Sequence, residues 1–283
     1  MTQSTNGLIV KLSTRKWSGR KADKGLSAEV EESKGAQAGV LSTSKKLVED
    51  HVLYRVNTLA RHARDTHLRY TRYWDDSGSR LLPAGSVADY RRDMDATILM
   101  YDEAAEELVA GIDEHIQAAQ ARLGGVFNPA DYPNKEKLRK QFAMSVEYSP
   151  IPDGKFIPMD IEGRDQLVQI VEAQVRDKLT EGTRQLFYHL REALVSMKKN
   201  VERFTQESDV GPFYQSTVDA VVEISSYLPE LNITHDPYLE KAVEIIQRDF
   251  AGLDRNLLRA SPERAKVVVD QVSHLLDSLP VEE

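Results

Sequence analysis

Residues 87–119 carry mostly apolar side chains at two interleaved positions of every seven, and this spacing constrains the fold more than any other feature of the chain. The positions are Val87, Tyr90, Met94, Ile98, Tyr101, Ala105, Leu108, Ile112, His115 and Ala119. A stripe with this period keeps one face of a helix against a partner along its whole length. Ser86 is a suitable N-cap and the pair Gly124-Gly125 a suitable end, so the sequence predicts one long helix between them.

Two further segments, residues 36–74 and 163–206, carry similar helical patterns. In the second of these, Gly182 weakens the middle of the helix and favours a kink there. After Gly211-Pro212 the pattern shortens, and we expect three ordinary helices at about 212–227, 237–253 and 262–279. The predicted fold class is mainly α, with long antiparallel coiled-coil-like helices, a small β-hairpin and a C-terminal helical bundle.

Strand signals are few. Leu8–Leu12 is compact and β-branched, which predicts a short N-terminal strand before a polar, mobile loop over residues 13–35. After a short predicted helix near 134–146, residues 146–159 are the most strand-like part of the chain. Their turn Pro152-Asp-Gly154 predicts a hairpin, because proline presets φ and glycine permits positive φ. The prolines confine this hairpin to a sheet edge, where the N-terminal strand could join it.

These segments divide the chain into three predicted parts. Residues 1–35 form an N-terminal strand and a basic flexible arm, residues 36–206 form a long-helix domain with the hairpin inserted near 146–159, and residues 207–283 form a C-terminal helical bundle. Seven-residue repeats pair as well between chains as within one chain, so a homo-oligomer is an open alternative.

Formal charge is spread unevenly along the chain. The total is −8, although residues 1–24 hold six basic residues against Asp23 alone and therefore carry +5. An acidic body disfavours a wide electrostatic footprint on nucleic acid, whereas a short basic arm can still touch phosphate or an acidic partner. The chain has no cysteine, no signal-peptide run and no apolar stretch near the roughly 20 residues that span a bilayer, so we expect a cytoplasmic protein without membrane contact.

The basic arm combines four cations with an aromatic residue on a glycine-containing segment. Its candidate interaction residues are Arg15, Lys16, Trp17, Arg20 and Lys21. Arms of this composition often fold onto a partner or a nucleic-acid backbone. Charge-rich termini also occur simply because they are well solvated, and Trp17 is then a local anchor.

A second candidate surface lies in residues 61–74, where basic and aromatic side chains alternate. Its candidate interaction residues are Arg61, Arg64, Arg69, Tyr70, Arg72, Tyr73 and Trp74. Arginine binds phosphate bidentately, and tyrosine and tryptophan offer platforms on which single-stranded bases stack. The alternative is structural: Tyr70 and Trp74 pack into the helix seam, and the arginines pair with the acidic residues of the second helix, which are Asp102, Glu103, Glu106, Glu107, Asp113 and Glu114.

No segment carries a catalytic signature. His62 and His67 lie five residues apart without the acidic residue of a zinc hydrolase motif, and the acidic pairs of the second helix lack the Glu-x-x-His partners of a di-metal bundle. Glycine-rich phosphate loops and a Gly-x-Ser-x-Gly elbow are also missing from the sequence. We therefore expect a protein that is not an enzyme and that has no cofactor and no metal.

The order of several features resembles a known family. The residues that carry the resemblance are the N-terminal strand, Lys16-Trp17 with Gly19-Arg20-Lys21, and the stretches 74–83, 124–133 and 148–152. In this order they resemble an uncharacterised family of tailed-phage and mobile-element proteins, a domain of unknown function, over about residues 1–160. Genes of that family often lie near an AAA+ ATPase of the chelatase-associated type and a von Willebrand factor A-like protein, or among phage replication genes. The resemblance implies an accessory role and brings no catalytic residue.

These observations favour a non-enzymatic accessory or adaptor protein, phage-encoded and working in the host cytoplasm, that binds a protein partner. The resemblance indicates an AAA+ ATPase of a replication, recombination or remodelling system as that partner. One alternative is a protein that binds single-stranded nucleic acid through residues 61–74 and the basic arm. A structural virion component is the other alternative, because long helices suit it equally well.

Overall fold

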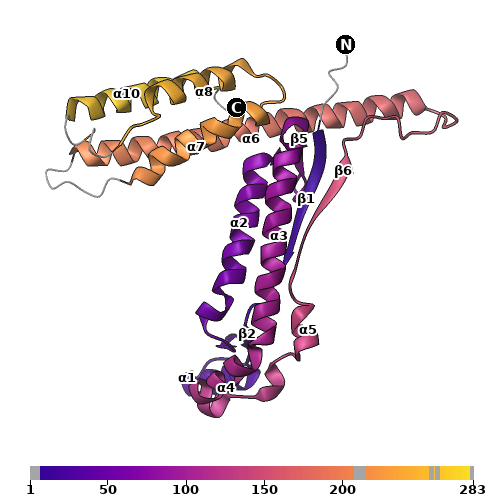
Figure 1. Cartoon of the computed structure of the whole chain (residues 1–283), viewed down its shortest axis with the longest axis vertical. Helices are drawn as coiled ribbons and strands as arrows, with labels where there is room; N and C mark the ends of the chain where they lie inside the picture. The colour runs from indigo at the N-terminus through magenta and orange to yellow at the C-terminus, as the bar shows by residue number, and fades with distance from the viewer. Residues whose placement is uncertain (1–6, 207–213, 255–257, 259–261, 281–283) are drawn as a thin grey trace. The chain divides into compact units, whose positions relative to one another are not determined.

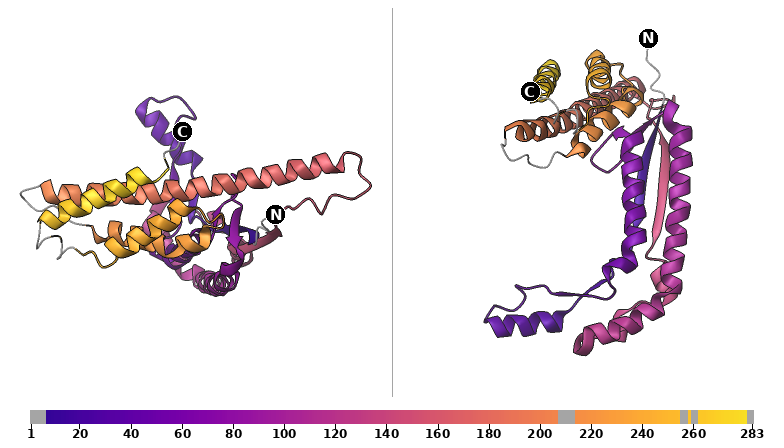
Figure 2. Two further views of the ribbon diagram at one scale, coloured as in Figure 1. Left: turned by 90° about the horizontal axis from the view of Figure 1, so that it is seen from above. Right: turned by 60° about the vertical axis from the view of Figure 1, so that its left-hand side comes forward.

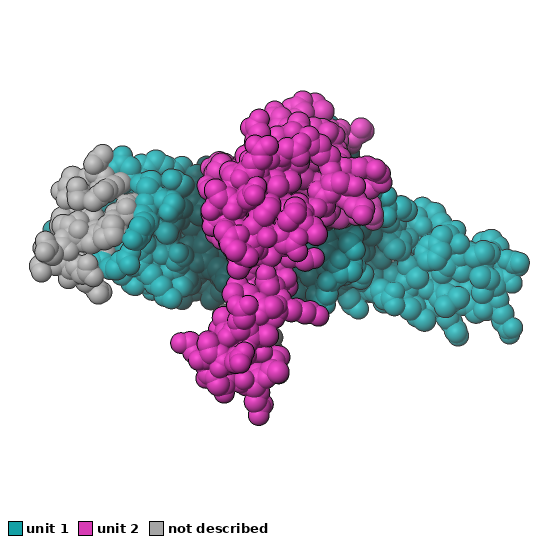
Figure 3. Space-filling view, turned by 90° about the horizontal axis from the view of Figure 1, so that it is seen from below, with its two compact units in different colours: residues 1–11, 68–90, 148–283 teal, residues 12–67, 91–147 magenta. Residues whose placement is uncertain are grey.

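A computed structural model of the chain describes residues 7–206, 214–254, 258 and 262–280, and the fold is mostly helical with a small antiparallel sheet (Figure 1). The chain divides into two compact units, which Figure 3 colours separately. Unit 1 comprises residues 1–11, 68–90 and 148–283, and unit 2 comprises residues 12–67 and 91–147.

The predicted long helix over 87–123 consists of α3 (Val87–Ala110) and α4 (Ile112–Leu123), with an interruption at Gly111. Its stripe is a buried face, as predicted: the buried members are Tyr90, Met94, Tyr101, Ala105, Leu108, Ile112 and Ala119. The hydroxyl of Tyr101 donates a hydrogen bond of 2.6 Å to the carbonyl of Arg15, which ends strand β1 (Gly7–Arg15). At this point the stripe therefore faces a strand, and a seven-residue period does not require a helical partner.

The prediction of one helix over 36–74 was wrong for its first half. Helix α2 covers only Tyr54–Tyr70 and follows a 3₁₀ turn, η1 (Asp50–Leu53). The preceding residues contain β3 (Ser44–Lys46), which pairs with β2 (Arg20–Ala22) in a two-stranded antiparallel ribbon. Most apolar positions of the predicted helix are buried all the same, and Leu47 packs inward from outside any helix, whereas Val40 is 59% exposed.

The prediction of a mobile loop over 13–35 was also wrong. It contains β2 and helix α1 (Lys24–Lys34), whose N-cap Asp23 accepts a hydrogen bond of 3.0 Å from the amide of Leu26. Gly35 ends this helix in the left-handed conformation, at φ 63°. Asp23 and Gly35 are thus ordinary helix caps, and each can be recognised from the neighbouring residues in the sequence.

The main sheet has four strands in the order β4-β5-β1-β6, with β4 at Arg72–Tyr73, β5 at Arg80–Pro83 and β6 at Ala143–Pro150. The N-terminal strand and its position beside the later strand are confirmed. The hairpin over 146–159 is wrong, since β6 is a single strand and residues 151–163 hold no strand. Pro150, Pro152 and Pro158 supply no amide donors for a second strand. Helix α5 (Lys135–Arg139) is shorter than predicted because β6 begins at Ala143.

Three short 3₁₀ turns complete the connections at Ala84–Ser86 (η2), Gly124–Val126 (η3) and Pro129–Asp131 (η4). Residues 75–79 form a turn, in which the Asp75 carboxylate accepts hydrogen bonds from the amides of Ser77 and Ser79. None of the helices that the structure describes combines the length and apolar character needed to cross a bilayer.

Unit 1 contains the long helix α6 (Arg164–Gln206) with α7 (Gln215–Leu231), α8 (Pro237–Asp249) and α10 (Pro262–Ser278) alongside it (Figure 1). These match the predicted helices, although the expected beginnings at Gly211-Pro212 and Ser261 lie outside the described residues. Buried apolar residues of all four helices form one core. Within α6, only residues from Leu186 onward contribute to that core.

Candidate interaction surfaces

The basic arm is held in place, because its aromatic residue is an anchor. Trp17 is only 6% exposed. Two residues later, the carbonyl of Gly19 accepts a 2.8 Å hydrogen bond from the amide of Leu47. Gly19 has φ +63°, and a Cβ there would lie within 3 Å of side chains of Val48 and Leu53. The predicted flexible arm is therefore a fixed segment, and the side chains exposed from it are Arg15, Lys16, Arg20 and Lys21.

The β2–β3 ribbon places like charges opposite one another. Arg20 pairs in register with Lys46, and Lys21 pairs with Lys45. Like charges directly opposite in an antiparallel pair destabilise it. Lys46 has a carboxylate partner, since its Nζ lies 2.7 Å from an oxygen of Asp50.

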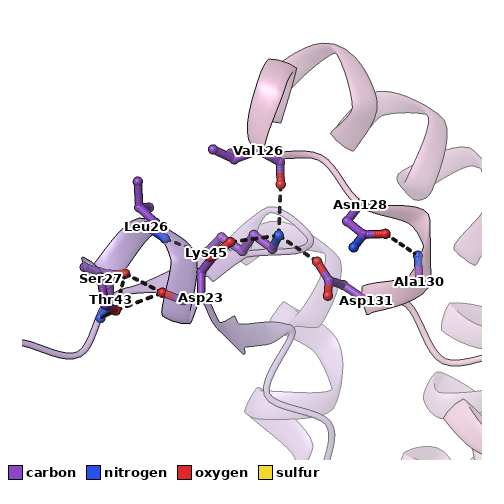
Figure 4. Close-up of polar contacts among 9 residues, drawn as sticks. All are labelled: Asp23, Leu26, Ser27, Thr43, Lys45, Val126, Asn128, Ala130 and Asp131. Atoms are coloured by element: carbon purple, nitrogen blue, oxygen red, sulfur yellow. Dashed lines mark hydrogen bonds and ion pairs between the residues drawn. The ribbon is translucent and has the colours of Figure 1, made fainter. Parts of the chain in front are cut away.

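Lys45 is compensated more completely, and Figure 4 shows its surroundings. Its Nζ lies 3.0 Å from Asp23 Oδ2 and 2.7 Å from Asp131 Oδ2, and it donates a 2.9 Å hydrogen bond to the carbonyl of Val126. The hydrogen bonds to Asp131 and Asp23 raise the pKa of Lys45. The hydrogen bond from the Leu26 amide and the Lys45 ammonium lower the pKa of Asp23. This Lys45 cluster ties α1 and the ribbon to the connector after α4.

A row of cations on and beside α2 brings together parts of both predicted surfaces. Lys16 Nζ donates a 2.8 Å hydrogen bond to Asn57 Oδ1. Arg61 and Arg64 lie four and seven residues beyond Asn57, on the same helix face, and both are exposed. We call Lys16, Arg61 and Arg64 the α2 row. Within the described chain, Arg61 and Arg64 make no ion pair.

The acidic residues of α3 do have basic partners, but not those predicted. Arg55 pairs with Glu107, and Arg139 pairs with Glu106 and Asp102. Hydrogen bonding to Glu106 raises the pKa of Arg139. The predicted charge pairing is thus made by arginines outside the 61–74 segment.

The aromatic end of the 61–74 segment is mostly buried within unit 1. Trp74 is 3% exposed, and Lys178 Nζ lies 5.1 Å from the centre of its ring. The Tyr70 ring makes an edge contact with Tyr90, at 5.9 Å between centroids. Tyr73 donates a hydrogen bond to Asp76, which raises its pKa. The use of Trp74 as a stacking platform is therefore wrong, because its ring is already covered; Arg69 is exposed but lies over the Tyr70 ring.

Arg72 is fully buried and ties strands to helices. Its Nη1 donates to Thr183 Oγ1 at 3.4 Å and to the Leu231 carbonyl at 3.3 Å, and its Nη2 donates to the Leu179 carbonyl at 3.3 Å. All three acceptors are neutral, and burial lowers the pKa of Arg72 to about 10. Nearby, Gly182 allows α6 to approach the carbonyl of Tyr73, from which an added Cβ would lie 2.9 Å. Gly182 therefore sits in a continuous helix for close packing, and Arg72 is structural.

The surface that the sequence did not reveal is the first half of α6 with the segment before it, residues 151–178, which we call the apolar arm. Figure 2 shows it extending beyond the three shorter helices of its unit (Figure 2). It exposes five large apolar side chains: Phe156 (66%), Met159 (83%), Ile161, Leu167 and Ile170 (51%). Phe156 and Met159 fall in the predicted hairpin and Leu167 and Ile170 in the predicted helix, whose partners cannot be identified from spacing alone; Ile161 belongs to neither prediction.

The apolar arm is ordered by its own contacts. Ile157 is buried, and its carbonyl accepts a 3.3 Å hydrogen bond from Arg164 Nε. Gly154, at φ +73°, packs so closely on Val168 that a Cβ would lie 3.0 Å from that side chain. The segment before α6 thus folds back on the first turns of the helix, while its other apolar side chains face outward.

The exposed charges of the apolar arm are mainly acidic. Four carboxylates in it make no ion pair within the described chain: Asp160, Glu162, Glu172 and Asp177. Its four cations are outnumbered by its six carboxylates: Lys155 pairs with Asp153, Lys178 pairs with Asp75, Arg164 lies 3.6 Å from Asp165, and Arg176 makes no ion pair within the described residues. The outward apolar side chains are therefore accompanied by an excess of negative charge.

Among the described residues, no three His, Asp or Glu side chains gather in a way that could hold a metal ion. Comparisons of the chain with protein-family models, with curated proteins and with solved structures gave no match. A function for the chain therefore has to be argued from its own surfaces and charges.

Proposed function

We propose that the chain is a non-enzymatic accessory protein that binds a protein partner through the apolar arm. The observation that carries the proposal is the exposure of Phe156, Met159 and Ile170 on an ordered segment outside the core of its own unit. Clustered exposed apolar side chains on a protein surface mark interaction sites, because water contact with them is unfavourable by about 25 cal/mol per Å².

The charges of the apolar arm define the chemistry of the partner. Carboxylates without ion pairs, such as Glu162 and Glu172, accompany the apolar side chains. A complementary segment has apolar residues at its centre and Lys or Arg at its edges, as in an amphipathic helix with basic flanks. The family resemblance adds the narrower proposal that this segment belongs to an AAA+ ATPase.

The test is site-specific photo-cross-linking in the native cell. A photoreactive phenylalanine replaces Ile170, and a matched variant carries it at Val195, which is exposed on the same helix but outside the apolar arm. We expect the first position alone to capture a partner, whose cross-linked peptide is apolar with basic flanks. The purified pair should then lose affinity on Ile170→Asp and not on Val195→Asp, and should weaken as salt rises.

Other results of the cross-linking experiment contradict or change the proposal. Capture at both positions, or a captured peptide without basic flanks, overturns the proposed surface. Capture of a second copy of this chain, with a doubled mass in light scattering, replaces the accessory role with self-assembly. Capture of a partner that is not an AAA+ ATPase supports the proposed surface and excludes the ATPase as its partner.

A further inference from the structure

We infer that the β2–β3 ribbon in unit 2 binds the phosphate backbone of nucleic acid without reading its sequence. This inference is independent of the apolar arm, which lies in unit 1. It rests on an excess of cations that the ribbon gathers in fixed positions.

The ribbon and its neighbours bring together more cations than carboxylates. Its cations come from both strands, from the first residue of α1 and from α4: Arg20, Lys21, Lys24, Lys45, Lys46 and Arg122. Arg122 belongs to this group because its Nη2 donates a 2.8 Å hydrogen bond to the carbonyl of Lys46. The carboxylates that face these cations are Asp23, Asp50 and Asp131. Six cations against three carboxylates leave a local surplus of positive charge.

The surplus positive charge makes no contribution to the stability of the ribbon. Arg20 and Lys46 lie opposite each other, and Asp50 is the carboxylate that interacts with both. Lys21 lies opposite Lys45, whose ammonium is already held by Asp23 and Asp131 (Figure 4). Arg20 and Lys46 therefore share one carboxylate, and Lys21 makes no ion pair within the described residues, so a bound polyanion would supply the negative charge that these cations lack.

The cations are also rigidly presented. Trp17 and Gly19 fix the start of β2, and the Lys45 cluster fixes β3. A fixed site loses less conformational entropy on binding than a flexible arm does. A two-stranded ribbon is moreover narrow enough for the major groove of a duplex.

Nucleic acid fits this surface better than an acidic protein does. The strands Arg20–Ala22 and Ser44–Lys46 expose no large apolar side chain, whereas protein interfaces have an apolar centre and few lysines. The buried rings of Trp17 and Trp74 offer no base a stacking face, so binding should be to phosphates and not to bases.

The experiment is a fluorescence anisotropy titration of the full chain with labelled duplex and single-stranded DNA over a salt series. We expect both to bind at low salt, with an affinity that falls roughly 10²- to 10³-fold between about 50 and 200 mM salt, as about five phosphate contacts require. The double variant Arg20→Glu/Lys21→Glu should lose binding and lower the salt slope by about 2, and Arg20→Lys/Lys21→Arg should retain it.

The control has the same change of charge in the same unit: Lys137→Glu/Lys140→Glu on α5 and at its C-cap, where both residues are exposed. Trp17 fluorescence, measured in a Trp74→Phe background, verifies that each variant keeps unit 2 folded. The inference is overturned by an absence of binding at low salt, by equal losses in the two double variants, or by a labelled polyglutamate that binds as tightly as DNA. The last result assigns the ribbon to an acidic protein.

Discussion

The two units are built by different physics. The larger part of unit 1 is an apolar core shared by four helices, whereas the α1–β3 part of unit 2 is held by polar groups such as Lys45 and Glu31. Their charges differ as well: unit 1 holds 19 basic and 27 acidic residues, and unit 2 holds 18 of each. The contrast teaches that helical periodicity specifies one unit, while contacts between residues far apart in sequence specify much of the other.

The largest effect should come from the apolar core of unit 1. Leu194→Ala removes a fully buried side chain of α6, and we expect it to lower the free energy of unfolding of unit 1 by about 3 kcal/mol. The chain suits this measurement because its two tryptophans are buried in different units, Trp17 in unit 2 and Trp74 in unit 1. Urea unfolding of Leu194→Ala in a Trp17→Phe background reports unit 1.

The matched measurement uses Leu194→Ala in a Trp74→Phe background, where Trp17 reports unit 2. We expect the midpoint of that transition to stay close to its parent value. Equal shifts in both backgrounds would contradict the division into separately stabilised units.

A glycine-to-alanine change should have opposite signs in the two units. In α6, Gly182→Ala places a Cβ 2.9 Å from the Tyr73 carbonyl, and backbone cannot move aside cheaply. We expect unit 1 to lose about 1–2 kcal/mol, although alanine is the better helix former by about 1 kcal/mol. In α1, Gly25→Ala meets nothing closer than Asp23 Oδ1 at 3.5 Å, so unit 2 should gain some tenths of a kcal/mol.

Urea unfolding of single-tryptophan forms measures both changes. Stabilisation by Gly182→Ala would mean that α6 and β4 do not approach as closely as their backbones indicate. Destabilisation by Gly25→Ala would place α1 under a constraint that its contacts do not show.

The same contrast explains which elements the sequence could predict. Helices α6, α7, α8 and α10 have periodic apolar positions with local start or stop signals, such as Asp236-Pro237, so each could be read from neighbouring residues. The ribbon could not be predicted in this way, because β3 forms a strand by pairing with β2. The two strands are far apart in sequence: Lys21 pairs with Lys45, which lies 24 residues later. Strand β4 has only two residues, and no periodicity can be measured over that length.

The candidate sites divide in the same way. Arg61 and Arg64 are exposed on helix α2, whereas the sequence left open whether they face solvent or pair with acidic residues of the next helix. For Trp74 the sequence left two interpretations open, a stacking platform and a packed ring, because residue type alone cannot distinguish them; the ring is buried. The exposure of the apolar arm was not predicted, because it depends on whether distant parts of the chain pack over these side chains.

A smaller and more local effect should follow removal of the Lys45 ammonium. Lys45→Gln leaves Asp23 and Asp131 without their shared cation and removes the ammonium that donates to the carbonyl of Val126. We expect faster amide hydrogen exchange in β2, β3 and α1, with exchange in α6 and α7 unchanged. Asp50→Asn is the control, because its pair with Lys46 is exposed; a similar effect from it would show that the Lys45 cluster is not special.

The smallest effect should be a dependence of unit 2 on pH through Glu31. This carboxylate accepts hydrogen bonds from the amides of Leu41 at 2.8 Å and Gly39 at 2.9 Å, and those donors lower its pKa below the usual 4.5. A carboxyl whose pKa is lowered on folding stabilises the fold above its unfolded pKa, and this contribution disappears as pH falls through the folded pKa. Urea unfolding of unit 2 reported by Trp17, in a Trp74→Phe background, should therefore show Glu31→Gln as destabilised at about pH 6 and closer to the parent at about pH 3. Asp23 titrates in both proteins, so its own contribution cancels in the difference between them. A difference that is the same at both pH values would mean that Glu31 holds residues 39–41 through its shape alone, and the charge on its carboxylate would have no part in ordering the segment that leads into the ribbon.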